Sequence, residues 1–307
     1  MEYTLNQLRI FTKIVHCQSI TKASQELFLT QPAVSIQLKK FQDQFPIPLT
    51  EVVGKKLYVT DFGQEIAESA LKILDELDAI NYKTKAFRGH LSGRLKISTA
   101  STGKYVMPYF LSDFLRLHPA VDLVMDVTNK SQVVRNLEQN EVDFSLVSVV
   151  PEHLKLSTVK LLQNKLFLVG STGIKRSPRM PVRTLLERYP LLFREFGSAT
   201  RNSMEQFMEK ENWPTYKKIE LTSNEALKQA LIAGLGYSIM PLIGIKNELK
   251  SHDLEIIPYK GLPVITHWHL VWLSAKRLSP VAEAYLQFIQ QEKERIIRDT
   301  FAWFENY

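Results

Sequence analysis

One segment near the start of the chain restricts the possible folds more than any other. Residues 20–45 read ITKASQELFLTQPAVSIQLKKFQDQF and contain two short amphipathic stretches separated by a turn. In the second stretch, Val34 and Leu38 lie on one apolar face of a helix, while the other face is polar and basic. Thr30 is a good N-cap residue, and Pro32 falls in the first turn, where its missing N–H costs nothing. The segment therefore predicts two helices joined by a tight turn, as in a helix-turn-helix DNA reader.

The polar face of the predicted second helix carries side chains that suit DNA. Glutamine can pair bidentately with adenine, serine can bond to either kind of base, and lysines suit phosphates without reading sequence. A short basic hairpin follows and predicts a wing. An ordinary three-helix bundle would show similar apolar stripes, but these polar residues favour DNA binding. The predicted DNA-binding residues are Thr30, Gln31, Pro32, Ser35, Gln37, Lys39, Lys40, Lys55 and Lys56.

Two segments of the sequence resemble those of a known protein family. TKASQELFLTQPAVSIQLKKF looks like the signature of the LysR-type transcriptional regulators, and LTEVVGKKLYVTDFG resembles their wing. The similarity continues along the whole chain. Three residues depart from the family pattern: Thr50 stands where phenylalanine is usual, and Val52 and Ile36 stand where arginine is usual. These departures put the base preference in doubt. They leave Lys55 and Lys56 as the expected wing contacts.

The segment after the wing has the pattern of a coiled-coil seam, with spacings of four and three residues. A surface helix packed on its own domain is the alternative. In the resembling family this linker helix pairs two chains, so that two readers reach an interrupted inverted repeat in double-stranded promoter DNA. The resemblance therefore implies a homodimer or homotetramer. The predicted dimerisation residues are Ile66, Ala70, Ile73, Leu77 and Ile80.

From Arg94 onward, predicted strands and helices alternate in an α/β rhythm, which includes a helix over 104–117 and a crossover strand over 161–169. The resemblance implies a two-lobed effector domain similar to periplasmic solute-binding proteins. The expected fold class is thus α/β with an N-terminal all-α winged helix-turn-helix. The expected organisation is a DNA-binding domain (1–60), a linker helix (61–90) and an effector-binding domain (91–307), with lobe I at about 91–161 and 269–307 and lobe II at about 162–268.

Hydroxyl groups and cations gather where predicted strands end and helices begin. Ligands of open α/β sheets bind at the carboxyl ends of strands, and helix N-termini there favour anions. Each hydroxyl could instead be a simple helix cap, yet as a set they favour ligand contact. The predicted effector-binding residues are Ser101, Thr102, Lys104, Thr128, Asn129, Ser148, Thr200 and Arg201.

Segments such as STGKYVMPYFLSDF and SNEALKQALIAGLGYSIMP look most like the subgroup that regulates the RuBisCO (Calvin cycle) operon. Members of that subgroup sense phosphorylated sugars or nucleotide cofactors. The resemblance implies a small anionic effector, with phosphorylated compounds as candidates, and an activator that alters recruitment of RNA polymerase.

Composition agrees with a soluble DNA-binding protein. A net charge of +7 and a pI of 9.2 suit a polyanionic partner. No apolar run approaches the roughly 20 residues that span a bilayer, and the polar N-terminus lacks a secretory core, so we expect no membrane association and a cytoplasmic location. Cys17 is the single cysteine, which excludes disulfides within the chain and all-cysteine metal sites.

Enzymes form the rival class, together with two-lobed small-molecule binders that do not read DNA. The chain has no GxSxG elbow, P-loop or HExxH pair, and no cysteine in its α/β half. His267 and His269 share one face of a predicted strand, but the flanking tryptophans favour packing over metal binding. We therefore expect no catalytic residue, metal or cofactor.

Overall fold

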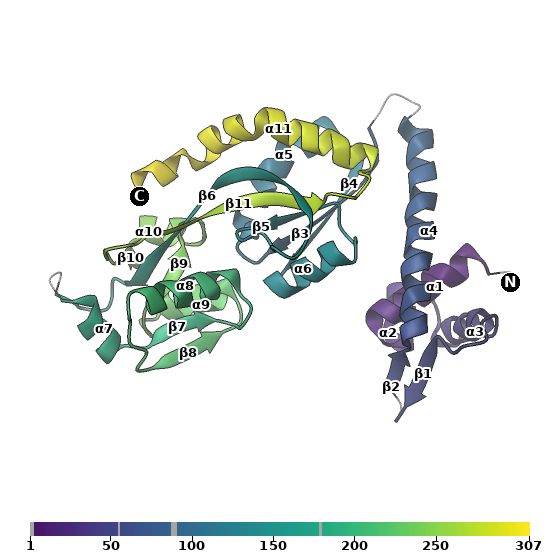
Figure 1. Ribbon diagram of the computed structural model, residues 1–307, viewed down its shortest axis with the longest axis horizontal. Coiled ribbons are helices and arrows are strands. Elements are labelled where there is room, and N and C mark those ends of the chain that lie inside the picture. Colours follow the sequence, from purple (N-terminus) through teal and green to yellow (C-terminus); the bar gives the residue numbers. More distant parts are fainter. Residues whose placement is uncertain (1–2, 55, 87–90, 178–179) are drawn as a thin grey trace. The chain divides into compact units, whose positions relative to one another are not determined.

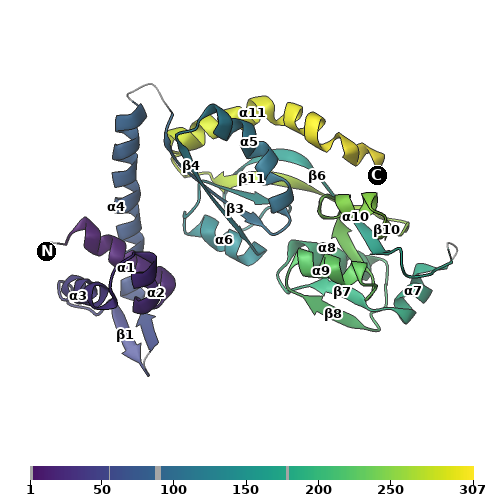
Figure 2. The ribbon, with the colours of Figure 1, turned by 180° about the vertical axis from the view of Figure 1, so that it is seen from behind.

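The computed structural model describes residues 3–307 except 55, 87–90 and 178–179. The chain divides into two compact units, Met1–His90 and Leu91–Tyr307, and each is described by itself (Figures 1 and 2). In the described part of the chain, no helix is long and apolar enough to cross a membrane.

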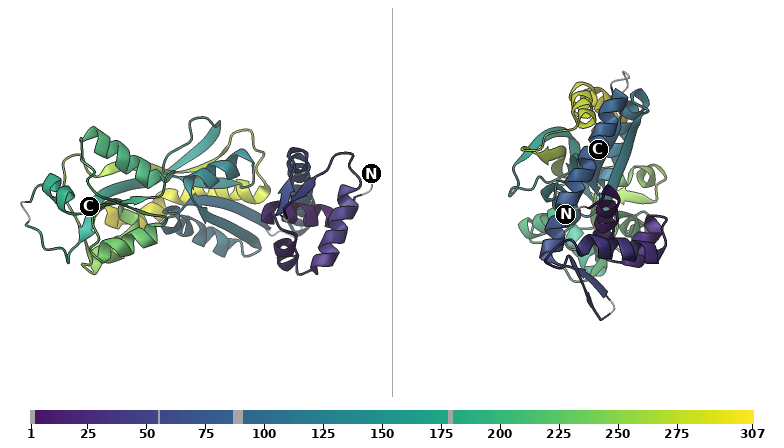
Figure 3. Two further views of the ribbon diagram at one scale, coloured as in Figure 1. Left: turned by 90° about the horizontal axis from the view of Figure 1, so that it is seen from below. Right: turned by 90° about the vertical axis from the view of Figure 1, so that its right-hand side faces the viewer.

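The N-terminal unit is a winged helix-turn-helix followed by one long helix. Its elements are α1 (Leu5–Cys17), α2 (Ile20–Glu26), α3 (Gln31–Gln42), β1 (Thr50–Val53), β2 (Lys56–Val59) and α4 (Asp61–Ala86). The first three helices begin at N-caps, because the hydroxyls of Thr4, Ser19 and Thr30 each accept a backbone N–H of the first turn. The antiparallel hairpin β1–β2 projects beyond the helices as the predicted wing (Figure 3).

The start of α4 is fixed to the wing by backbone contacts. The Leu49 carbonyl oxygen accepts a hydrogen bond from the Thr60 amide at 3.1 Å, and the Thr60 hydroxyl accepts one from the Gly63 amide at 2.9 Å. A Cβ atom at Gly63 would lie 2.0 Å from the Leu49 carbonyl oxygen. Only glycine therefore fits where the first turn of α4 crosses Leu49, the residue directly before β1.

The C-terminal unit contains two lobes built on strands of mixed direction. The first lobe holds β3 (Gly93–Ala100), η1 (Gly103–Tyr105), α5 (Met107–Leu117), β4 (Val121–Thr128), α6 (Lys130–Glu138), β5 (Phe144–Val147), α11 (Pro280–Phe301) and η3 (Ala302–Asn306). The second lobe holds α7 (Val182–Arg188), β7 (Leu191–Arg194), α8 (Ala199–Lys210), β8 (Lys218–Leu221), α9 (Asn224–Ile232), β9 (Ser238–Pro241), η2 (Leu242–Gly244), α10 (Lys246–Lys250) and β10 (Leu254–Ile256).

Two long strands, β6 (Leu156–Ser171) and β11 (Val264–Leu273), pass from one lobe to the other. They pair antiparallel from Leu156 opposite Leu273 to Leu166 opposite Val264, with one irregularity in the register. The strand order is β10-β6-β11-β5-β3-β4, and β9 also pairs with β6. The first lobe's sheet and the second lobe therefore share the same pair of strands, as expected for two crossovers.

Helices cover both faces of the first lobe's sheet. Figure 1 shows α5 and α11 on one face and α6 on the other. The main core joins residues of α5 and α11, such as Phe110, Phe114 and Tyr285, to Leu95 and Ile97 of β3, all of them buried. Burying this apolar surface is the dominant stabilising contribution of the unit.

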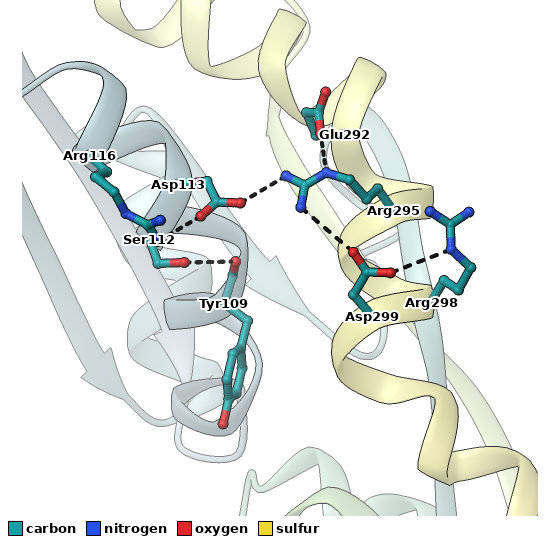
Figure 4. A network of polar contacts seen from close by, with 8 residues as sticks. All are labelled: Tyr109, Ser112, Asp113, Arg116, Glu292, Arg295, Arg298 and Asp299. Atoms are coloured by element: carbon teal, nitrogen blue, oxygen red, sulfur yellow. Dashed lines mark hydrogen bonds and ion pairs between the residues drawn. The ribbon is translucent and has the colours of Figure 1, made fainter.

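An ion-pair network on the protein surface ties α11 to α5 (Figure 4). Arg295 of α11 donates to an Asp113 carboxylate oxygen of α5 at 2.8 Å, and Asp113 also accepts from Arg116. The hydrogen bond from Arg295 holds the pKa of Asp113 below its usual value. These partly exposed pairs fix the orientation of α11 more than they add stability.

Two expected elements differ from the structure. The helix expected over 104–117 is divided into η1 and α5, because Pro108 lacks an N–H and fits only the first turn of a new helix. The crossover strand expected over 161–169 spans Leu156–Ser171, since its partner β11 extends the ladder beyond the apolar run.

Replacing Gly63 with alanine should lower the thermal stability of the protein. Alanine in a helix is normally about 1 kcal/mol better than glycine, but a Cβ here meets the Leu49 carbonyl oxygen, so the sign should reverse. Thermal unfolding followed by circular dichroism tests this, with Glu68→Ala on the exposed face of α4 as the control. A Gly63→Ala protein as stable as the parent would contradict the close approach.

Candidate functional site

The predicted DNA-binding residues of α3 differ in their exposure to solvent. Gln31, Pro32, Lys39 and Lys40 are exposed, while Ser35 and Gln37 are half-buried. Thr30 acts as the N-cap, and its hydroxyl accepts the Ala33 amide at 3.4 Å. On the opposite face, Val34, Leu38 and Phe41 are buried in the core of the unit, which holds the helix in place.

The wing contributes one described cation, Lys56, which is exposed. Lys55 lies outside the described residues. Thr50, which departs from the family's phenylalanine, is buried, and both its amide and its hydroxyl donate to Gln42 Oε1, at 3.2 and 2.7 Å. This contact joins the wing to the end of α3, and Gln42 is a positioning residue that no pattern in the sequence indicated.

The predicted dimerisation seam on α4 has two parts. Ala70 is buried and Ile66 is half-buried, and both pack in the core of the N-terminal unit itself. Ile73 and Ile80 are exposed, at 45% and 54%, and Leu77 is half-buried. The alternative of a helix packed on its own domain thus fits the first part, and Ile73, Leu77 and Ile80 are the predicted seam residues that the core of the N-terminal unit does not include.

The two lobes are bridged at Ser101, directly after β3. Its hydroxyl oxygen accepts hydrogen bonds from Arg194 Nη1 at 3.1 Å and Asn224 Nδ2 at 3.0 Å. Arg194 ends β7 and Asn224 begins α9, so both donors come from the second lobe. Ser101 was predicted to contact the effector, whereas Arg194 and Asn224 were not.

The Arg194 side chain is deeply buried, with only 4% of the residue surface exposed. Its guanidinium forms a two-pronged pair with Glu195, with both N–O distances at 2.7 Å. Guanidinium groups recognise carboxylates and phosphates in this geometry. The one signal in the sequence was an arginine at the end of an apolar strand, LLFRE.

Asn224 is 3% exposed, and its Oδ1 atom is buried with no hydrogen-bond partner among the described residues. An unsatisfied buried polar atom of this kind is costly unless a water or ligand reaches it. Asn224 is therefore a second polar group of the cleft with unused hydrogen-bonding capacity.

Arg201 has a structural role in this state of the protein. Its Nε donates to Glu205 at 2.7 Å, and its Nη1 donates to Glu220 at 2.7 Å and to the Arg194 carbonyl at 3.1 Å. Neighbouring Thr200 is buried in the first turn of α8. Arg201 thus holds the strand that carries Arg194, and its charge is already balanced by two carboxylates.

The remaining predicted effector residues lie on the first lobe. Asn129 caps α6, because its side-chain oxygen accepts a hydrogen bond from the Gln132 amide at 2.9 Å. The alternative interpretation of this residue as a helix cap therefore fits the structure. Thr128 is the last residue of β4 and Ser148 directly follows β5, and both are half-buried. Thr102 is buried at the start of η1. The start of α6 also approaches the second lobe, since a Cβ on Gly197 would lie 3.2 Å from Ser131 Oγ.

Lys104 is placed apart from the residues with which it was grouped. Its side chain lies on the Tyr105 ring and lines a cavity with Lys228 and Lys246, while the lining of that cavity includes neither Ser101 nor Arg201. In the described part of the chain, no group of three or more histidine, cysteine or acidic residues could hold a metal ion.

Two family models cover most of the chain. The model described as "Bacterial regulatory helix-turn-helix protein, lysR family" matches residues 5–64, and the "LysR substrate binding domain" model matches residues 88–294. These are the segments that form the helix-turn-helix and the two lobes.

Relatives and solved structures agree with both models. The chain is 32% identical to the HTH-type transcriptional activator CmpR of Synechocystis (95% of this chain, 97% of that protein) and 32% identical to the RuBisCO operon transcriptional regulator of Allochromatium vinosum (96% and 98%).

The regulatory domain of Synechocystis CcmR in complex with 2-PG has 27% identity and a TM-score of 0.61, over 66% of this chain and 97% of that one. Full-length CbnR complexed with its target DNA has 17% identity and a TM-score of 0.68 (95% and 100%), which shows the shared fold. The chain therefore belongs to the LysR family of transcriptional regulators, with an N-terminal winged helix-turn-helix and a C-terminal effector-binding domain.

Proposed function

We propose that this regulator reads an interrupted inverted repeat in promoter DNA and changes that binding when a small anion occupies the cleft around Ser101. The observation that carries the proposal is the bridge in which Arg194 and Asn224 of one lobe both donate to Ser101 of the other. A ligand that takes over these bonds changes the contact between the lobes directly.

The chemistry of the cleft favours an anionic effector. Glu195 occupies the fork of the Arg194 guanidinium, in the way that a carboxylate or phosphate of a ligand would. The similar CcmR domain is in complex with 2-PG, and two relatives are named as regulators of the RuBisCO operon. We therefore choose 2-PG as the first ligand to test.

The effector acts through its different affinity for two states of the lobes. A ligand shifts such an equilibrium only by its differential binding, so the anion must bind the rearranged Ser101 bridge better than the present one. In a homodimer or homotetramer paired through α4, a changed arrangement of lobes would alter DNA bending and the recruitment of RNA polymerase, as in an activator.

We assign the DNA contacts to residues of α3 and the wing that are exposed or half-buried. Gln31 and Ser35 reach base edges, and Lys39, Lys40 and Lys56 reach phosphates. Ile36, which replaces an arginine of the family pattern, is exposed and can contact a thymine methyl group. Because its proposed target is promoter DNA, we infer a cytoplasmic location. We assign the protein no catalytic role.

The direct test is fluorescence anisotropy of the full-length protein with its own upstream intergenic DNA and with a scrambled duplex, at several salt concentrations. A specific reader should bind the native duplex at least ~10³-fold tighter. Equal, weak binding to both duplexes would overturn DNA reading and leave a two-lobed small-molecule binder.

Gln31→Ala should relax sequence preference at one base pair by about 1–3 kcal/mol, because it removes one base-edge contact. Lys39→Ala is the contrasting variant, since losing a phosphate contact weakens binding to all duplexes and lowers the salt slope by about one. Anisotropy on a set of single-base operator variants separates the two. A uniform loss for Gln31→Ala would remove it from base reading.

Arg194→Met should abolish the effect of 2-PG on DNA binding. The variant removes the guanidinium that we assign to the anion, while its long apolar side chain fills the same space. Arg188→Met, an exposed residue at the end of α7, is the matched control. A normal 2-PG response in Arg194→Met would place the effector elsewhere.

Glu195→Gln should tighten 2-PG binding by about tenfold, because the ligand no longer displaces a charged competitor from Arg194. Glu209→Gln makes the same charge change on the exposed face of α8 and should have no effect. Isothermal titration calorimetry measures both affinities. Weaker binding in Glu195→Gln would mean that Glu195 supports the ligand and does not compete with it.

A further inference from the structure

A second cavity lies in the C-terminal unit, outside the Ser101 bridge. It has a volume of about 260 Å³ and is bounded by η1 and the start of α5, by the middle of α9, by η2 and α10, and by the last turn of α11 with η3. Its walls thus come from both lobes. Neither the helix-turn-helix nor the proposed effector cleft uses it.

Three ammonium groups line this cavity, from Lys104, Lys228 and Lys246, together with the carboxylate of Glu248. Glu225 also interacts electrostatically with Lys104. Lys228 pairs with Glu225 at 3.1 Å and Glu248 at 2.9 Å. Lys104 and Lys246 have no ion pair with any carboxylate among the described residues. A concave site with two unpaired cations attracts anions, and lysine binds phosphate groups as a point charge.

Aromatic rings lie beside the two lysines that form no ion pair. Lys246 Nζ lies 4.7 Å from the centre of the Trp303 ring, and Lys104 Nζ lies 5.0 Å from that of Tyr105. Cation–π contacts of this kind position an ammonium group without neutralising its charge. Burial, followed by the charge of Lys250, lowers the pKa of Lys246, so a nearby anion would relieve a cost that the protein now carries.

The aromatic C-terminal segment forms one wall of the cavity. Phe301 is buried in the main core, and Lys165 donates to the carbonyl oxygens of Phe304 at 3.0 Å and Tyr307 at 3.1 Å. These contacts hold Trp303 beside α10. Figure 1 shows the end of α11 above α10 and β10, next to the second lobe.

We propose that this cavity is a second anion-binding site, which takes a small phosphorylated compound between Lys104 of the first lobe and Lys246 of the second. A bound phosphate group would link η1, α10 and the C-terminal segment. Since Lys104 is three residues from Ser101, the ligand would also bear on the segment that bridges the effector cleft. This site is additional to the effector cleft and does not depend on the proposed function.

The test is isothermal titration calorimetry of full-length protein with inorganic pyrophosphate at about 0.15 M salt, where surface charges are largely screened. Lys246→Met and Lys104→Met should each weaken pyrophosphate binding by about tenfold or more, the usual effect of losing a charged hydrogen bond. Lys210→Met, an exposed lysine at the end of α8, makes the same charge change and should bind as the parent does.

Two results would overturn the site. One is the absence of saturable pyrophosphate binding up to about 10 mM, which corresponds to negligible affinity. The other is equal binding by the parent, Lys104→Met and Lys246→Met proteins. Arg194→Met separates this site from the effector cleft, since it should lose the response to 2-PG and keep the parent's affinity for pyrophosphate.

Discussion

The antiparallel pairing of β6 with β11 is the constraint on which the C-terminal unit depends. Both strands run through both lobes, so the lobes are joined by a hydrogen-bonded ribbon and not by two loops. Such a ribbon bends and twists more readily than it slides, because sliding would break every bond of the ladder. The single register irregularity, between His267 and His269, is where bending is easiest.

This ribbon explains why small contacts in the cleft matter. With the lobes joined along one side, their separation at Ser101 is set by a few bonds from Arg194 and Asn224. The two candidate sites differ in their charges: Arg194 is already paired with Glu195, whereas Lys104 and Lys246 of the second cavity form no ion pair among the described residues. A ligand at Ser101 would replace the partners of Arg194, whereas a ligand in the second cavity would supply a counter-charge to its lysines.

Much of the fold followed from local patterns. Apolar spacing and N-cap residues such as Thr30 predicted the helix-turn-helix, and alternating strands and helices predicted the α/β half. The groups that complete the cleft could not be found this way, because Arg194 and Asn224 meet Ser101 across 93 and 123 residues of chain. For the same reason the sequence grouped Lys104 with the wrong residues, because its neighbours in the cavity come from the distant elements α9, α10 and η3.

The close approach of Gly63 to the Leu49 carbonyl oxygen leaves no room between the wing and the first turn of α4. Ala67 and Ala70, further along the same helix, are buried in the core of the N-terminal unit, where α4 packs against α1. The start of the long helix, the wing and the reading helix therefore move as one body. A rotation of α4 would rotate the wing and the reading helix together relative to bound DNA.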